Sequence, residues 1–203
     1  MEPFLQAQLQ ILNEENFSEN NSKRFEDAMG LLKNNQKHNF SKYTFDGDYD
    51  KRTTSAYCFG IVFILFHELA HYLLGHLSKN EETLNDEECA DDKVFWDIYM
   101  AEGLGEKEKF TANVGILLAL FSLLFMNPKM KSDKIHPRED VRILKVYDTI
   151  KDGSSKYTTL VVSLFKDWAK KFEIKEFPNV SEKENDNALN EIRSFLSSKK
   201  EFD

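Results

Sequence analysis

One five-residue segment, His-Glu-Leu-Ala-His at positions 67–71, constrains the fold of this chain more than any other feature. It lies within residues 56–77, which begin with a long apolar run and predict one helix that other elements surround. In a helix, His67 and His71 are about 40° apart around the axis, so both imidazoles leave the same face one turn apart. The pair can therefore bind one metal ion, and Glu68, roughly 100° from His67, can reach a water molecule beside that ion.

The length and the hydrophobic pattern predict a single domain, residues 1–203, built mainly of α-helices. A chain of 203 residues with 41% hydrophobic residues can bury one compact core. The motifs concentrate in a core at about 55–145, and apolar residues at helical spacing predict C-terminal helices at about 156–198. At most a small β element is expected near residues 40–46, where aromatic and polar residues alternate.

Charge and cysteine content narrow the class of protein and its compartment. The formal net charge of -8 argues against nucleic acid as a main partner, because such a partner requires a concentrated basic surface. Two cysteines, Cys58 and Cys89, provide no framework of disulfides, so a reducing cytoplasm is the expected compartment. The first residues show no basic stretch followed by an apolar segment, and we therefore expect no secretory signal.

Two apolar segments raise the question of a membrane span. Residues 56–66 provide only 11 residues before His67, and a segment of this length is too short to cross a bilayer. Residues 110–126 cover roughly 25 Å as a helix and include the polar residues Thr111, Asn113 and Ser122. This segment favours a buried core helix, and association with a membrane is the alternative. The sequence does not indicate an oligomeric state.

A catalytic zinc site needs a third protein ligand and an open position for water. His76 comes nine residues after His67, which places it about 180° around a continuous helix and away from the shared face. We therefore interpret His76 as a structural residue or a residue at the rim of the site. An earlier end of the helix at Gly75 is the alternative, because it would free His76 from this geometry.

The remaining candidates for the third ligand are four carboxylates at the start of the next predicted helix: Glu87, Glu88, Asp91 and Asp92. The first and third share one helical face, and the second and fourth share another, so spacing alone leaves two choices. Acidic residues in a first turn also stabilise the helix dipole, which is an alternative explanation for all four.

Three segments together resemble the gluzincin metallopeptidases of the HtpX and CAAX-prenyl-protease branch. They are residues 67–71, Glu-Glu-Cys-Ala-Asp at 87–91 and His-Pro-Arg-Glu-Asp-Val-Arg at 136–142. In that branch, His-Glu-x-x-His is followed by Glu-x-x-Ala-Asp and then by a His-Pro element with an arginine soon after. The chain size and the amino-acid sequence of residues 67–76 more closely resemble the small phage-exclusion peptidases of the Lit type. The resemblance covers about residues 55–145 and implies a compact, helical, zincin-like fold.

The resemblance also implies a role for each matching residue. Glu87 becomes the third ligand of Zn²⁺, and Asp91 becomes a carboxylate that orients a liganding imidazole. His136 and Arg142 border the active cleft, where His136 polarises the substrate carbonyl or the oxyanion. A residue that simply opens a helix is the alternative for His136. The linker before Glu87 is shorter than in the transmembrane members, which implies a soluble, reduced form and keeps Glu88 as a competing ligand.

We therefore expect a zinc-dependent endopeptidase that hydrolyses a peptide bond in a specific protein. Zinc activates a water molecule, and Glu68 is the general base. The substrate would lie along an edge strand, for which residues 40–45 are a weak candidate. The Lit-type resemblance implies a narrow target in the host cell, such as a translation factor, in defence against phage.

Two alternatives compete with this function. One is a non-catalytic metal-binding module that regulates or scaffolds, in which zinc has only a structural role. The other is a peptidase that cleaves repressors, a type that usually accompanies a DNA-binding domain. Glu68 distinguishes the enzymes from the module, because a purely structural metal site needs no free carboxylate beside its ligands.

Overall fold

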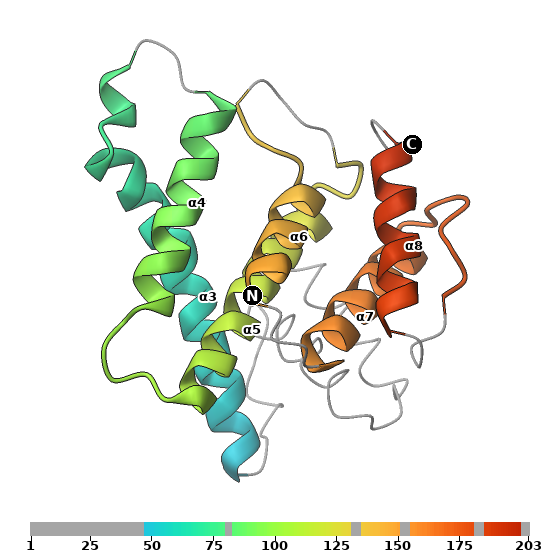
Figure 1. The fold of residues 1–203 in the computed structure, drawn as a ribbon, viewed down its shortest axis with the longest axis horizontal. Coiled ribbons are helices and arrows are strands. Elements are labelled where there is room, and N and C mark those ends of the chain that lie inside the picture. The colour runs from blue at the N-terminus through green and yellow to red at the C-terminus, as the bar shows by residue number, and fades with distance from the viewer. Residues whose placement is uncertain (1–46, 80–82, 131–134, 151–154, 181–184, 200–203) are drawn as a thin grey trace, which may run out of the picture.

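In the computed structural model, the described residues are 47–79, 83–130, 135–150, 155–180 and 185–199 (Figure 1). With the labels of Figure 1, the elements are α3 (Gly47–Leu73), η2 (His76–Ser78), α4 (Leu84–Tyr99), α5 (Glu106–Met126), α6 (Glu139–Ile150), α7 (Ser155–Lys171) and α8 (Asn185–Ser198). All of these elements are helical, and the described ranges contain no strand. The prediction of a mainly α fold is therefore confirmed, while the β element predicted near residues 40–46 lies outside the described residues.

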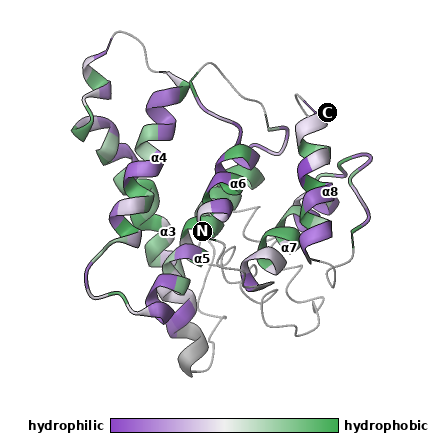
Figure 2. Cartoon of the chain, in the orientation of Figure 1, coloured by the Kyte–Doolittle hydropathy of each residue, from purple (hydrophilic) through white to green (hydrophobic). Residues whose placement is uncertain are grey.

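Helix α5 is the centre of the fold. It packs against α3, α4, α6 and α7, and Figure 1 shows it between the α3–α4 pair and the α7–α8 pair. Its side chains from Ala112 to Ser122 are all buried, because neighbours cover every side of this helix. The hydropathy colouring in Figure 2 shows the contrast with α4 and α8, which carry hydrophilic residues on part of their surface. The expected core helix at residues 110–126 is thus enclosed by protein.

Two glycines allow α3 and α5 to cross closely. A Cβ atom on Gly60 would lie 2.9 Å from the carbonyl oxygen of Gly115. A Cβ atom on Gly115 would collide with the carbonyl oxygen of Ala56 and lie 2.9 Å from the Cβ atom of Phe59. The two backbones approach each other as they do because neither position carries a side chain. This crossing fixes the half of α3 that leads to His67.

Helix α3 differs from its prediction at both ends. It begins at Gly47, well before the expected start at residue 56, and it ends at Leu73 rather than near residue 77. The argument that this segment is too short to span a membrane is therefore wrong. Residues 51–73 are long and apolar enough to do so, although the core helix of a soluble protein meets the same test. Its outer face exposes several large apolar side chains: Leu65, Phe66, Leu69, Tyr72 and Leu73.

The C-terminal helices are attached to the segment that precedes α6. Helices α7 and α8 pack against each other, with Trp168 and Phe165 of α7 fully buried. The guanidinium of Arg138 donates hydrogen bonds to the carbonyl oxygen of Leu196, at 3.1 Å, and to that of Lys199. These two contacts fix the end of α8 against the segment that carries His136.

Candidate active site

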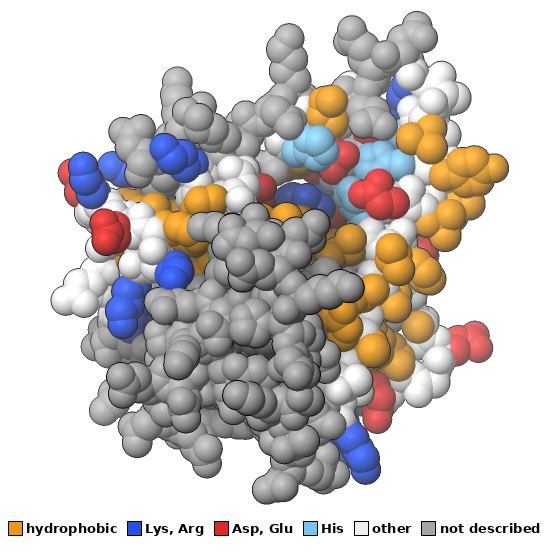
Figure 3. Space-filling view, turned by 180° about the vertical axis from the view of Figure 1, so that it is seen from behind, with side chains coloured by type: hydrophobic (Ala, Val, Ile, Leu, Met, Phe, Trp, Pro, Cys, Tyr) orange, Lys and Arg blue, Asp and Glu red, His pale blue; other side chains and the backbone are white. Residues whose placement is uncertain are grey.

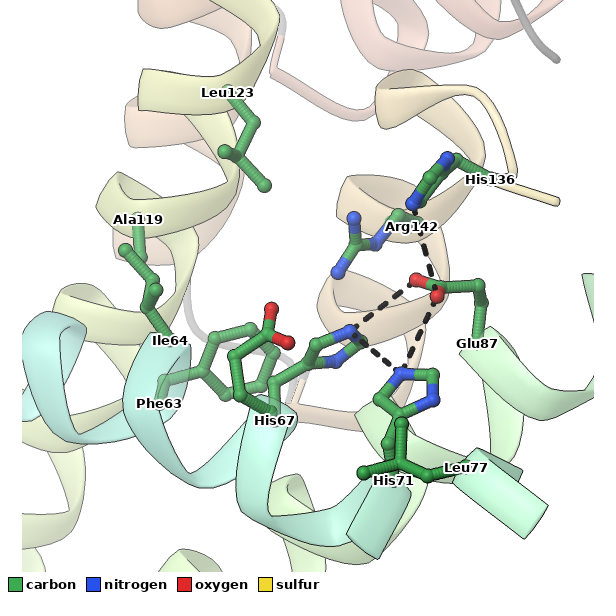
Figure 4. A pocket seen from close by; sticks show the side chains of 11 residues that line it. Phe63, Ile64, His67, His71, Leu77, Glu87, Ala119, Leu123, His136 and Arg142 are labelled. Carbon is green, nitrogen blue, oxygen red and sulfur yellow. Dashed lines mark hydrogen bonds and ion pairs between the residues drawn. The ribbon is translucent and has the colours of Figure 1, made fainter. Parts of the chain in front are cut away.

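Helices α3 and α4 bring two imidazoles and one carboxylate together (Figure 4). The Nε2 atoms of His67 and His71 are 3.2 Å apart. One oxygen of Glu87 lies 3.2 Å from Nε2 of His67, and the other lies 3.3 Å from Nε2 of His71. All three side chains are buried, and their polar atoms lie close together among apolar side chains.

The donor set fits a zinc ion. Zinc binds imidazole nitrogen and carboxylate oxygen at about 2.0–2.2 Å in tetrahedral geometry, which puts neighbouring donors about 3.3 Å apart. The two histidine nitrogens are 3.2 Å apart, close to this value, and each lies within 3.3 Å of one of the two oxygens of Glu87. With one ligand atom taken from each residue, the three atoms lie within 4.8 Å of one another. Two histidines and a glutamate are also the ligands of a known kind of catalytic zinc site, with a fourth position open. The three residues predicted as ligands thus form a group that can hold a metal.

The structure separates Glu87 from its competitor Glu88. Glu87 occupies the first turn of α4 and is 3% exposed, with its carboxylate directed at the two histidines. The side chain of Glu88 is 52% exposed and lies 3.8 Å from Lys145 on the outside. Because the two residues follow each other on a helix, only one of them can face the histidines. Geometry therefore favours Glu87 as the third ligand.

Asp91 lies behind His67, one turn after Glu87 on α4. Its Oδ1 atom is 2.9 Å from Nδ1 of His67. Arg142 of α6 donates two hydrogen bonds of 2.7 Å to the same carboxylate, in the forked geometry that holds such a pair rigidly. The structure thus places Asp91 where the sequence predicted it. Arg142 lines the pocket, and its polar contacts here are with Asp91.

These contacts control the ionisation of the buried groups. Burial lowers the pKa of His67, but Asp91 and Glu87 outweigh it and raise that pKa to about 9. Burial raises the pKa of Asp91, but His67 and Arg142 outweigh it and lower that pKa. The pKa of Glu87 is lowered in the same way, chiefly by His67. Both carboxyl groups therefore stay ionised, as metal binding and support of a liganding imidazole require.

A pocket of about 300 Å³ opens beside this group. Glu68 of α3 lines it, is exposed, and makes no hydrogen bond or ion pair with another described residue. Apolar side chains complete the wall: Phe63, Ile64, Leu77, Ala119 and Leu123. Figure 3 shows histidine, acidic and hydrophobic side chains side by side on this face of the molecule. A carboxylate at a pocket with no partner among the described residues is available for proton transfer.

His136 stands at the edge of the site, three residues before α6 begins. Its side chain is 56% exposed, and its Nε2 atom lies 3.8 Å from an oxygen of Glu87. It does not open the helix, since α6 starts at Glu139, so the alternative explanation for this residue is wrong. Figure 4 shows His136 and Arg142 on the same side of Glu87. The position suits a residue that borders a cleft.

Two further residues at the site, His76 and Asp86, were not predicted to belong to it. His76 is buried, and its Nδ1 atom lies 3.2 Å from Nδ1 of His71. Asp86 is 1% exposed, and its Oδ1 atom lies 3.4 Å from Nε2 of His76. The interpretation of His76 as a structural residue is consistent with this position, but a place at the rim is not. Asp86 was assigned to a polar linker and instead belongs to the first turn of α4.

The residues around Asp86 also carried a signal in the sequence. Thr83 and Asp86 form a capping box: the backbone N–H and the hydroxyl of Thr83 each donate to Oδ2 of Asp86 at 3.0 Å. This motif starts α4 and puts Glu87 in its first turn. A hydrogen bond from Lys79, the largest cause, lowers the pKa of Asp86 to about 2.

The buried group of two histidines and a glutamate, set at a pocket of a helical domain, has the donor set of a catalytic metal centre. A profile of the Peptidase U49 family matches residues 6–162. Because the match covers more than half of the chain, the protein belongs to this family of peptidases. No curated protein and no solved structure matches the chain. The expected peptidase function is therefore supported at the level of the family.

Proposed function

We propose that this protein is a zinc-dependent endopeptidase of the gluzincin type, which cleaves a specific protein substrate. The observation that carries the proposal is the convergence of His67, His71 and Glu87, which each offer one ligand atom within 4.8 Å of the others. Glu68 lies at the adjoining pocket with no described partner. Membership in a peptidase family supports the reaction class.

Each side chain then has one task. His67, His71 and Glu87 would hold the zinc ion, which would supply a Lewis acid able to polarise a peptide carbonyl and to lower the pKa of water. Glu68 takes the proton of the attacking water and delivers it to the leaving amine. Asp91 holds His67 by its Nδ1 atom, so that the Nε2 lone pair faces the metal position. Arg142 holds Asp91 in turn.

His136 is proposed to stabilise the oxyanion. Its ring is exposed at the edge of the pocket, and its Nε2 atom lies 3.8 Å from an oxygen of Glu87, close to the proposed ligands. An imidazole N–H that lines the pocket can donate to a carbonyl oxygen bound there as negative charge develops on it.

The biological setting comes from the resemblance to the Lit-type peptidases. It supports a narrow protein target in the host cell, such as a translation factor, for a cytoplasmic protein that acts in defence against phage. The net charge of -8 is in keeping with a protein substrate rather than nucleic acid. The pocket, with its apolar wall, offers a place for a hydrophobic side chain of that substrate.

The test compares the wild-type protein with Glu68→Gln in the same cells. We expect the variant to keep bound zinc and to lose proteolysis, because the amide cannot accept the proton. Bound zinc is measured on the purified proteins, and new protein N-termini are compared across the two proteomes. Cleavage that survives in Glu68→Gln would refute the mechanism, and the absence of new N-termini with wild type would favour the non-catalytic module. The cleaved protein also separates a host target from a repressor.

A further inference from the structure

The two histidines of the metal-binding group differ in what supports them from behind. His67 meets a carboxylate directly, because Oδ1 of Asp91 lies 2.9 Å from its Nδ1 atom. His71 meets another imidazole, with its Nδ1 atom 3.2 Å from Nδ1 of His76. The rings of His71 and His76 stand nearly edge to face, with centroids 5.0 Å apart. A third imidazole is therefore buried directly behind a ligand.

Only one arrangement of protons lets His71 bind a metal through Nε2. The metal needs the Nε2 lone pair, so the ring hydrogen of neutral His71 must sit on Nδ1. That N–H points at Nδ1 of His76, which must therefore be an acceptor. A neutral His76 with a lone pair on Nδ1 carries its own hydrogen on Nε2. This hydrogen faces Oδ1 of Asp86, at a distance of 3.4 Å between the heavy atoms.

The fold sets up this chain of contacts at the end of α3. Gly75 has φ 74 and ψ 18, a left-handed conformation that ends the helix and turns the chain into η2. The turn carries His76 back beneath His71, where a continuous helix would have sent it to the opposite side. On the other side of His76, Thr83 and Lys79 hold Asp86 in place. Local structure thus fixes the positions of both His76 and Asp86.

We propose that His76 is a positioning residue for the metal centre, which accepts the Nδ1 hydrogen of His71 and is itself held in the required tautomer by Asp86. The inference rests on the proposed function, since it assigns His71 as a zinc ligand. His76 then does for His71 what Asp91 does for His67. The two supports differ in where the carboxylate lies. Asp91 contacts His67 directly, whereas the imidazole of His76 lies between Asp86 and His71. No transfer of a proton through the chain is needed for this role.

A matched pair of variants separates the hydrogen bond from the packing. His76→Asn keeps an acceptor close to the position of Nδ1, whereas His76→Leu fills a similar volume and has no acceptor. We expect His76→Leu to lower the zinc affinity about 10- to 100-fold, as loss of such an outer partner does, and His76→Asn to lower it much less. Zinc affinity is measured by competition with a chromophoric chelator, and thermal unfolding of the metal-free proteins reports the packing effect separately.

The outcomes are distinct. Equal zinc affinity in His76→Leu and wild type, or an equal loss in both variants, would overturn the inference while leaving the proposed zinc peptidase intact. A wild-type protein that binds no zinc would overturn the proposed function and the inference together.

A second measurement uses the unaltered protein. In the zinc-loaded wild type with ¹⁵N-labelled histidines, long-range ¹H–¹⁵N spectra report which ring nitrogen of each histidine carries hydrogen. We expect His76 to carry its hydrogen on Nε2, and His71 to carry its hydrogen on Nδ1. A hydrogen on Nδ1 of His76 would exclude the proposed hydrogen bond, whatever the variants do.

Discussion

The metal-binding group has two sides, one that supports His67 at its Nδ1 atom and one that supports His71 at its Nδ1 atom. The two sides use different residues for this support. On one side, His67 is supported by Asp91, and Asp91 is held by two hydrogen bonds from Arg142. On the other side, His71 is supported by His76, with Asp86 behind it. The first side joins three helices, α3, α4 and α6, through a buried ion pair. The second side uses a turn at the end of α3 and the cap of α4.

This difference predicts how substitutions on each side affect stability and zinc affinity. The first side holds charges in a buried place, so removal of one partner leaves another charge uncompensated. The second side has an imidazole, His76, in direct contact with His71, and its position depends on the backbone of a tight turn. We therefore expect large effects on stability from the first side and smaller effects, mainly on zinc affinity, from the second.

The largest effect should come from Glu87, because its carboxylate contacts both His67 and His71. Glu87→Gln removes the only anionic ligand and breaks both sides at once. We expect zinc affinity to fall by more than the 10- to 100-fold typical of an outer partner, with loss of proteolysis. Zinc content after dialysis and chelator competition measure the change.

Glu88→Gln is the matched control for this substitution. It makes the same chemical change at the next position of α4, on an exposed side chain. Zinc affinity and proteolysis should stay at the wild-type level. If Glu88→Gln lost zinc and Glu87→Gln kept it, the assignment of the third ligand would have to be exchanged.

The second largest effect should come from Asp91→Ala, which breaks the first side alone. Arg142 would then be left without the carboxylate that its guanidinium grips, and His67 without its support. We expect the metal-free protein to lose about 3–5 kcal/mol of unfolding free energy, as when one partner of a buried ion pair is removed. Zinc affinity should fall as well. Denaturant unfolding of the metal-free protein measures the first effect.

Asp92→Ala is the control on the outer face of the same helix turn. Asp92 pairs with Lys145 at 2.8 Å, and about half of its side chain is exposed, so its removal should cost less than about 1 kcal/mol. Equal losses for Asp91→Ala and Asp92→Ala would show that the contact of Asp91 with Arg142 contributes no more than a surface pair.

The first side could be predicted from the sequence and the family resemblance. Of the second side, only the helix end near Gly75 was among the stated alternatives, and the contact of His76 with Asp86 was not predicted. The four-residue spacing of His67 and His71 requires only a helix, and the structure has that helix. The resemblance to a known branch of peptidases then selected Glu87 and Asp91 from four carboxylates that spacing left equivalent. The core helix at 110–126 followed from its mainly apolar composition. In each case a regular helix converts sequence spacing into position.

His76 and Asp86 were misplaced because both lie at helix ends. Extension of α3 to residue 77 sends His76 to the far side, whereas the left-handed Gly75 ends the helix and brings His76 back. Glycine after a helical run is a known stop signal, but it does not tell in which direction the chain will leave. Asp86 was hidden in a polar stretch, although Thr83 three residues earlier makes a capping box with it. Local signals existed for both residues, but their contact depends on how α3 and α4 pack.

The smallest effect should come from Gly75→Ala, which alters the second side through the backbone alone. A Cβ atom at this position has room, since its nearest neighbour is Oγ of Ser78 at 3.8 Å. The cost is therefore conformational: about 1 kcal/mol for a residue other than glycine at a positive φ. We expect a loss of that order in unfolding free energy, and a fall in zinc affinity smaller than that of His76→Leu. Gly75→Asn should lose less than Gly75→Ala, because asparagine tolerates the left-handed region better. Unfolding curves and chelator competition on the two variants test this order. If alanine and asparagine behaved alike and like wild type, the left-handed turn would not control the position of His76, and the second side would owe its geometry to Asp86 instead.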